Sequence, residues 1–326
     1  MMRIGVAGAG HLGKIHLKCI QQIPEYDLVG FFDSNPDTSE VVAEEFGIKS
    51  FSSYSDLINH CDIVDIVTPT GTHYRLASEA LTSGKHVFIE KPVCATMEEA
   101  RELLQMAGER GLKVQVGHVE RFNPAFQAIA HYGFQPMFVE GHRLAQFNPR
   151  GTDVSVVLDL MIHDLDLVLH MIHSPVREIH ANGVAVVSQE PDICNARIEF
   201  ENGATVNLTA SRISLKNMRK LRLFQPSCYV SIDFLEKEVQ IVQLADQVED
   251  SESSGYLPLE TNHGTKYIKL ENPEIRPNNA IVDELRNFLL SVRDNLPVAV
   301  DLADGTRALD IAFRIMEKMN ASYARI

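Results

Sequence analysis

The first third of the chain alternates short apolar runs with segments of helical periodicity. From Leu12 to Gln21, for example, apolar residues recur every three or four positions. Strands that alternate with helices favour a doubly wound parallel sheet, with ligand-binding loops at the carboxyl ends of its strands. We expect the run Lys113–Val116 to close a sheet of six strands, five of which are this run and the apolar runs at 4–7, 28–32, 63–67 and 86–89. Helices are expected at 38–46 and 97–110, and another that runs to Ser83, each followed by glycine.

The pattern changes near residue 120. One helix is expected over 122–132 and a long apolar helix over 154–171. Antiparallel strands are expected at 137–146, 176–187, 193–200, 205–211, 221–225, 229–233 and 239–242. The acidic, serine-rich stretch 248–264 is expected to be an exposed loop, and two helices, 280–292 and 302–319, to end the chain. The class is therefore α/β, with one domain over 1–120 and an α+β domain over 121–326.

A glycine-rich turn follows the first apolar run directly. Gly8 permits a tight turn, Gly10 lets the backbone approach a pyrophosphate, and Gly13 lets the next helix pack closely on the strand. His11 and Leu12 lie between these glycines, at the helix N-terminus where free N–H groups favour an anion. This arrangement of strand, turn and helix is typical of a Rossmann dinucleotide-binding domain.

The next apolar run ends in Asp33, twenty residues beyond the third glycine. An acid at this distance accepts hydrogen bonds from the adenosine ribose hydroxyls. Its charge would repel a 2′-phosphate, and no arginine occurs in the following Ser34–Pro36, so NAD is favoured over NADP. FAD and S-adenosylmethionine are the other ligands that such a turn can bind.

Composition and net charge limit the classes of partner that this protein is expected to bind. The chain has 326 residues, 45% of them hydrophobic, which suffices for two domains. With 44 acidic and 30 basic residues its net charge is −14, which argues against nucleic acid and against an anionic membrane surface. The five scattered cysteines indicate reduced thiols. We expect a cytoplasmic protein, because the first strand leaves no room for a signal peptide and no apolar run approaches a membrane span.

The apolar helix over 154–171 carries a polar stripe. Asp159, His163, Asp166 and His170 follow one another at spacings of four, three and four, which places them on one side. Charged groups are rarely buried without a partner or a function. Three interpretations are open: a metal site using His163, Asp166 and His170; a structural Asp166–His170 pair; and catalysis by Asp159 and His163. We favour catalysis, with His163 accepting the proton of an alcohol, Asp159 orienting it, and no metal.

The tripeptide Glu90–Lys91–Pro92 follows directly after a buried strand. The proline biases Lys91 toward an extended conformation and permits a cis bond. A lysine held at the carboxyl edge of the sheet can bind a substrate hydroxyl and stabilise developing alkoxide charge.

These motifs resemble the glucose–fructose oxidoreductase, inositol dehydrogenase and rhizopine-catabolism (Gfo/Idh/MocA) family over essentially the whole chain. The resemblance rests on the glycine turn, on Thr68-Pro69-Thr70-Gly71-Thr72-His73, on Glu90–Pro92, and on Asp159 with His163. It implies a large open, mostly antiparallel second sheet through which a homodimer or homotetramer forms. It further implies that Lys91, Asp159 and His163 are the catalytic trio. The cofactor would contact Glu90, Lys91 and the loop residues Thr68, Pro69, Thr70 and His73.

A narrower resemblance bears on the substrate. Segments 117–124 and 157–164 are similar to UDP-N-acetylglucosamine 3-dehydrogenases, which implies oxidation of the 3-hydroxyl of a UDP-N-acetylhexosamine. Arginine offers a fixed fork of donors that suits a diphosphate. Candidate substrate residues are therefore Lys91, Arg121, Asn123, Arg143, Arg150, Asp159 and His163. The alternatives are a dehydrogenase of inositol, a free sugar, a dihydrodiol or a biliverdin-like compound, and a dinucleotide sensor without chemistry.

Overall fold

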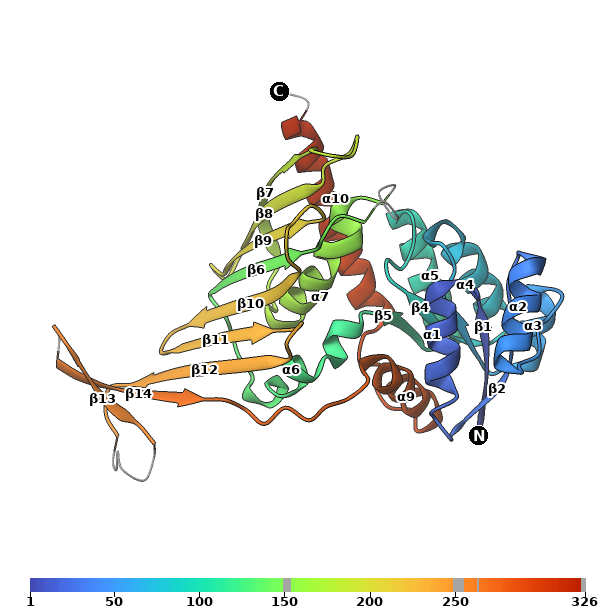
Figure 1. The fold of residues 1–326 in the computed structure, drawn as a ribbon, viewed down its shortest axis with the longest axis horizontal. Coiled ribbons are helices and arrows are strands. Elements are labelled where there is room, and N and C mark those ends of the chain that lie inside the picture. Colours follow the sequence, from blue (N-terminus) through green and yellow to red (C-terminus); the bar gives the residue numbers. More distant parts are fainter. Residues whose placement is uncertain (149–153, 249–254, 263, 324–326) are drawn as a thin grey trace. The chain divides into compact units, whose positions relative to one another are not determined.

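The computed structural model describes residues 1–148, 154–248, 255–262 and 264–323. The chain forms two compact units (Figure 1). The first comprises residues 1–122 and 279–310, and the second comprises 123–278 and 311–326. The expected division after residue 120 differs from this one late in the chain, because residues 279–310 belong to the first unit.

The first unit contains a parallel sheet in the order β2-β1-β3-β4-β5. Its strands are β1 (Met2–Ala7), β2 (Tyr26–Phe32), β3 (Ile63–Ile66), β4 (His86–Glu90) and β5 (Val114–Gly117). The parallel sheet is confirmed, but the expected six strands were wrong, since the sheet has five within the described residues. At β5 an isolated antiparallel bridge joins Gln115 to Asp301, and the N–H of Val116 donates to the carbonyl of Val300 at 3.0 Å.

Helices cover both faces of this sheet. Helices α1 (His11–Ile20) and α9 (Ala280–Arg293) bury Leu17, Leu285 and Phe288 against apolar side chains of β1 and β4. On the other face, α3 (Tyr54–His60) approaches β1 so closely that a Cβ at Gly5 would lie 2.6 Å from the Leu57 side chain. This core combines residues of the first 122 positions with residues of α9, which is why 279–310 belong with the Rossmann domain.

The remaining helices of the first unit follow their capping residues. In α2 (Pro36–Phe46) the Asn35 side chain accepts hydrogen bonds from the N–H groups of Asp37 and Thr38, so the helix begins two residues earlier than expected. A capping box of Thr96 and Glu99 begins α5 (Met97–Arg110), whose bounds are confirmed. Helix α4 (His73–Thr82) completes this set, whereas the sequence analysis did not identify α3.

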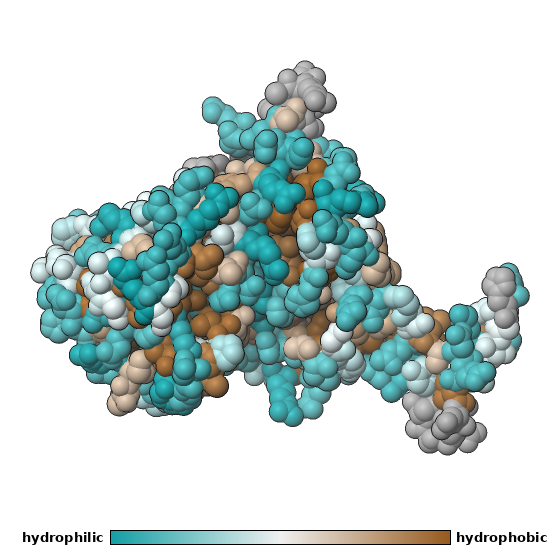
Figure 2. All heavy atoms as spheres, turned by 180° about the vertical axis from the view of Figure 1, so that it is seen from behind, coloured by the Kyte–Doolittle hydropathy of each residue, from teal (hydrophilic) through white to brown (hydrophobic). Residues whose placement is uncertain are grey.

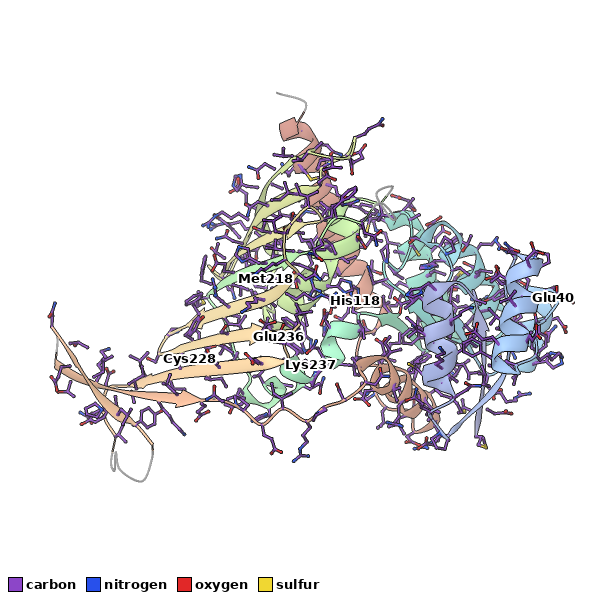
Figure 3. The ribbon with its side chains drawn as sticks, viewed as in Figure 1. Glu40, His118, Met218, Cys228, Glu236 and Lys237 are labelled. Carbon is purple, nitrogen blue, oxygen red and sulfur yellow. The ribbon has the colours of Figure 1, made fainter. Side chains whose placement is uncertain are left out.

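The second unit contains a nine-stranded sheet in the order β13-β14-β12-β11-β10-β6-β9-β8-β7 (Figure 1). All its pairings are antiparallel except β6 with β9. Strands β10 and β11 form a hairpin, and their first residues, Met218 and Cys228, lie at its opposite ends (Figure 3). The strands are β6 (Phe138–Leu144), β7 (Val176–Val184), β8 (Ile193–Phe200), β9 (Thr205–Ser211), β10 (Met218–Gln225), β11 (Cys228–Asp233), β12 (Glu238–Ala245), β13 (Leu257–Thr261) and β14 (Gly264–Glu271).

Two expectations in this unit were wrong. The helix expected over 122–132 is broken into η2 (Val119–Phe122), α6 (Pro124–Gln127) and η3 (Ala130–Tyr132), because Asn123 caps a new helix whose first residue is proline. The loop expected over 248–264 contains β13, which pairs with β14 as a hairpin. The side chains of β13 are mostly exposed, and those of β14 are exposed or partly exposed. Along this hairpin, apolar (brown) residues lie among polar ones in Figure 2. The segment therefore has no inward-facing apolar pattern that would indicate a strand.

The long apolar helix has two parts. A π-helical turn, η4 (Val157–Met161), precedes α7 (Ile162–Met171). Short π segments inside helices occur often at functional sites. The last helix, α10 (Leu302–Tyr323), is preceded by Asp301, whose side chain accepts the N–H of Asp304 at 2.8 Å and so caps the helix. Among the described residues, no helix combines the length and the apolar character needed to cross a membrane.

Asp192 organises the connection between β7 and β8. Its buried carboxylate accepts the backbone N–H groups of Val186, Val187 and Ser188 at 2.7–2.9 Å. Burial alone would raise the pKa of Asp192, but these hydrogen bonds lower it to about 2.

Replacing Asp192 by asparagine should therefore destabilise the second unit in a pH-dependent way. The ionised carboxylate contributes stability that is fully present above its unfolded pKa of about 4 and is lost as the pH falls toward 2. We expect Asp192→Asn to cost on the order of 2 kcal/mol at pH 7 and progressively less below pH 4, measured by urea unfolding. Glu190→Gln, at an exposed position of the same loop, is the control. An equal cost at pH 7 and pH 3 would contradict this account.

Candidate active site

The turn between β1 and α1 has the geometry that its glycines require. Gly8 has φ +99°, and a Cβ at Gly13 would lie 2.1 Å from the carbonyl oxygen of Gly8. Around Gly10, in contrast, a Cβ would meet no atom within 4 Å, so the space there is open. Gly10 precedes the exposed residues His11 and Leu12, which form the first turn of α1. This open helix N-terminus fits the pyrophosphate of a dinucleotide.

Asp33 lies at the end of β2 and faces this turn. One carboxylate oxygen accepts the backbone N–H of Ala9 at 2.7 Å, and the other accepts that of Asn35 at 2.9 Å. A carboxylate has further lone pairs, so Asp33 can also accept hydrogen bonds from ribose hydroxyls. The acid and the glycine turn are thus one hydrogen-bonded structure, as the dinucleotide fingerprint requires.

His73 connects the loops that follow β3 and β4. Its Nε2 lies 2.8 Å from the carbonyl oxygen of Thr68, and its Nδ1 lies 3.0 Å from that of Pro92. Burial lowers the pKa of His73, so the ring is neutral and donates through one nitrogen at a time. Pro69 and Thr70 lie in the same loop, where the Thr72 hydroxyl donates to the carbonyl of Pro69 at 2.8 Å.

Glu90 and Lys91 lie at the carboxyl end of β4. Glu90 is buried, and its Oε2 accepts the backbone N–H of Lys91 at 3.1 Å. The Lys91–Pro92 peptide bond is cis, and the Lys91 side chain is partly exposed. On the neighbouring strand, a Cβ at Gly117 would lie 2.6 Å from Oε1 of Glu90, so glycine makes room for this carboxylate. The buried His118 follows at the end of β5 (Figure 3).

Next to Glu90 lies a cluster of buried polar side chains that the sequence analysis missed. His16 of α1 is fully buried, with Nδ1 2.9 Å from Asp65 of β3 and Nε2 3.2 Å from Glu90. Glu284 of α9 is also fully buried, and neither of its carboxyl oxygens has a hydrogen-bond partner among the described residues. The available signal was Asp65, an acid in the middle of an apolar strand, where a charge calls for a partner.

The groups of this cluster shift one another's pKa values, and for Asp65 burial raises the pKa more than the charge and hydrogen bond of His16 lower it. Burial would lower the pKa of His16, but the charges of Asp65 and Glu90, together with the Asp65 hydrogen bond, raise it well above its usual value. Burial would raise the pKa of Glu90, but His16 and Lys91 lower it. For Glu284, burial and the neighbouring Glu90 charge both raise the pKa well above its usual value. At neutral pH, His16 is therefore an imidazolium, Glu90 is a carboxylate and Glu284 is a neutral acid.

Asp159 and His163 belong to the second unit. Asp159 lies in the π turn and His163 in the first turn of α7, and both side chains are partly exposed. The π turn interrupts the regular spacing on which the expected stripe was based. Further along α7, Asp166 is buried, whereas His170 is exposed and its ring lies 6.2 Å from that of Phe126. In the described part of the chain, no group of three or more His, Cys, Asp or Glu residues could hold a metal ion.

The candidate substrate residues differ in their surroundings. Arg143 is buried and binds the carboxylate of Asp164 through two nitrogens, at 2.7 and 3.1 Å, which favours a structural role. Arg121 is buried in the first unit, 3.7 Å from Asp304. Asn123 donates to the carbonyl of Phe234 at 3.1 Å and accepts the N–H of Ala125. Arg150 lies outside the described residues.

Comparison with known proteins gives a consistent result. Residues 2–118 match the family described as "Oxidoreductase family, NAD-binding Rossmann fold", and residues 126–230 match the "GFO/IDH/MocA C-terminal domain". A UDP-N-acetylglucosamine 3-dehydrogenase from Acidithiobacillus ferrooxidans is 36% identical over 325 residues, 99% of each chain. A solved structure of that enzyme has a TM-score of 0.88 and 34% identity over 98% of both chains. A myo-inositol 2-dehydrogenase from Thermotoga maritima is 25% identical over 96% of this chain and 94% of that protein.

The fold and the glycine turn thus define a dinucleotide-dependent oxidoreductase. The chain belongs to the GFO/IDH/MocA family, and its first unit is the NAD-binding Rossmann domain of that family. The family resemblance inferred from the motifs is confirmed.

The glycine turn allows a matched pair of substitutions. Gly13→Ala should destabilise the first unit by about 1–3 kcal/mol, because its Cβ would collide with a backbone oxygen that cannot move aside. Gly10→Ala should leave the melting temperature nearly unchanged, since its Cβ enters open space, but should weaken NADH binding. Thermal unfolding and titration of NADH fluorescence measure the two effects. Equal destabilisation by both variants would contradict this assignment.

Proposed function

We propose that this protein oxidises the 3-hydroxyl of a UDP-N-acetylhexosamine with NAD. The observation that carries the proposal is the 36% identity, over 99% of both chains, to a protein named for oxidation at this position of UDP-N-acetylglucosamine. The matching architecture at a TM-score of 0.88 supports it. The inositol dehydrogenase is less similar, at 25% identity, so an inositol or another polyol is the second candidate substrate.

In this proposal Lys91, Asp159 and His163 perform the chemistry on the sugar. His163 removes the proton of the hydroxyl, Asp159 orients the imidazole, and the Lys91 ammonium stabilises the developing alkoxide. When bound, the nicotinamide would supply the acceptor for the hydride that leaves the carbon bearing this hydroxyl. The anchoring of Lys91 through Glu90, and the partial exposure of all three side chains, support these roles.

The proposed cofactor site comprises Gly8, Gly10, His11, Leu12, Gly13, Asp33, Thr68, Pro69, Thr70, His73, Glu90 and Lys91. NAD is preferred over NADP because the Asp33 carboxylate would repel a 2′-phosphate, and both of its oxygens already accept backbone N–H groups. For the nucleotide diphosphate, the proposed contacts are Arg121, Asn123 and Arg150. Arg143 remains a candidate through its charge, although Asp164 engages its guanidinium.

We also propose that copies of the chain associate through the nine-stranded sheet as a homodimer or homotetramer. Along β6 and β9, buried residues alternate with partly exposed ones, so one side of the sheet is more accessible. A cytoplasmic location is part of the proposal and is supported by five free cysteines, four of them buried.

A substrate panel tests the function. The protein should reduce NAD when mixed with UDP-N-acetylglucosamine, and should react more slowly with UDP-glucose, free N-acetylglucosamine, myo-inositol and scyllo-inositol. Hydrazine is included to trap the ketone, and NADP replaces NAD in a parallel series that should be slower. The readout is NADH absorbance. Turnover of an inositol without turnover of any nucleotide sugar would refute the substrate assignment.

Substitutions at the trio test the roles of its members. Lys91→Met and His163→Ala should each lower kcat by about 10²–10⁴-fold, because each removes a group that acts in the transition state. NADH binding, followed by fluorescence, should persist in both variants. Lys216→Met and His131→Ala, at exposed positions, serve as matched controls. Near-native turnover by both trio variants would show that the roles are misassigned.

A further inference from the structure

The cluster next to Glu90 is buried more deeply than an ordinary ion pair. His16, Asp65 and Glu284 come from α1, β3 and α9, and all three have 0% exposed area, within a largely apolar core that also buries Gln115, whose amide donates to the carbonyl of Glu284 at 3.0 Å. The His16 ring also makes an edge contact with Phe88, with ring centroids 5.8 Å apart. Burying ionisable groups in such surroundings is costly, and replacement by apolar residues is often neutral or stabilising. Stability alone therefore does not explain this cluster.

The cluster is connected through Glu90 to the backbone of Lys91. The imidazole of His16 is oriented by a hydrogen bond between Nδ1 and Asp65, while its Nε2 lies 3.2 Å from Oε1 of Glu90 as an ion-pair contact without hydrogen-bond geometry. The second oxygen of Glu90 accepts the backbone N–H of Lys91. Three short contacts, of 2.9, 3.2 and 3.1 Å, thus connect the interior of the sheet to the peptide from which the Lys91 side chain extends.

We propose that His16 is a positioning residue for Lys91: held by Asp65, it fixes the Glu90 carboxylate, and Glu90 in turn fixes the Lys91 peptide. The Glu90 charge also favours the ammonium form of the neighbouring lysine. The Lys91 side chain would then extend from a fixed backbone position and carry an ammonium group, and a residue that stabilises alkoxide charge needs both.

The effect of pH follows from the groups that face this cluster. His16 faces Asp65, Glu90, Glu284 and Cys19, whereas Glu90 also faces Lys91 and His73, and Asp65 also faces Tyr26. Without the imidazolium, burial raises the pKa of Glu90, because only Lys91 still opposes it. Glu90 is then neutral at low pH and regains its charge as the pH rises.

His16→Gln is the informative substitution, because glutamine keeps an N–H donor but carries no charge. We expect kcat at pH 7 to fall on the order of 100-fold and to recover at higher pH, as Glu90 ionises. NADH affinity should change little; since the chain has no tryptophan, it is measured by the fluorescence of NADH itself. Glu90→Gln should show the same loss without recovery at any pH.

The matched control is Glu284→Gln. Glu284 belongs to the same cluster but is a neutral acid, so an amide of the same shape should leave the pH profile of kcat unchanged. If His16→Gln does not fold, Asp65→Asn replaces it, because this change frees the imidazole on one side and should shift the profile in the same direction. An unchanged profile in the folded variant, with only a lower melting temperature, overturns the proposal.

Because the inference rests on the proposed role of Lys91, a second readout uses no substrate. Acetylation of the Lys91 amine by acetic anhydride is followed by mass spectrometry as a function of pH. At pH 7, where Glu90 of His16→Gln is neutral, the Lys91 ammonium loses a neighbouring negative charge, so labelling should be faster than in the wild type, and the difference should disappear at the higher pH at which Glu90 ionises. Faster labelling at pH 7 with unchanged turnover supports the link from His16 to Lys91 and refutes the catalytic role of the lysine. An unchanged labelling rate at pH 7 overturns the link itself.

Discussion

The close approach of α1 to β1 is the constraint on which the first unit depends. With no side chain at Gly13, the helix comes so near to the strand that the carbonyl oxygen of Gly8 occupies the space where a Cβ would stand. This contact sets where the N-terminus of α1 opens toward a phosphate. One turn later, the same contact sets the depth of His16 and so lets its ring reach both Asp65 and Glu90. Cofactor binding and the buried cluster share one packing requirement.

The two units use charge in different ways. In the first, a single imidazolium lies between carboxylates within an apolar core, and its surroundings determine the protonation of each group. In the second, a carboxylate stabilises backbone N–H groups of one loop, as Asp192 does, or a guanidinium, as Asp164 does. The negative net charge of the whole chain predicts none of these arrangements, because each depends on a few contacts of about 3 Å.

Local signals made much of this structure predictable. Apolar runs and the glycines that follow helices identified the parallel sheet, α5 and β8, because in these elements burial and capping follow the sequence directly. The hairpin β13–β14 escaped prediction because its residues are mostly exposed, and the break at Asn123–Pro124 was hidden within an apolar stretch. Of the candidate site, the glycine turn, Asp33 and Lys91 were proposed from motifs, and their roles stay predictions. The pairing of His16 with Asp65 depends on residues 49 positions apart, which no local pattern specifies.

The path of the chain bears on how the protein is synthesised. The first unit supplies the opening 122 residues, yet its core includes Leu285 and Phe288 of α9, and its buried cluster includes Glu284. On the ribosome these residues emerge only after the whole nine-stranded sheet has been made. The dinucleotide-binding unit is therefore the first to begin folding and among the last to be completed, and during that interval part of its apolar surface is exposed to the chaperones that guard nascent chains.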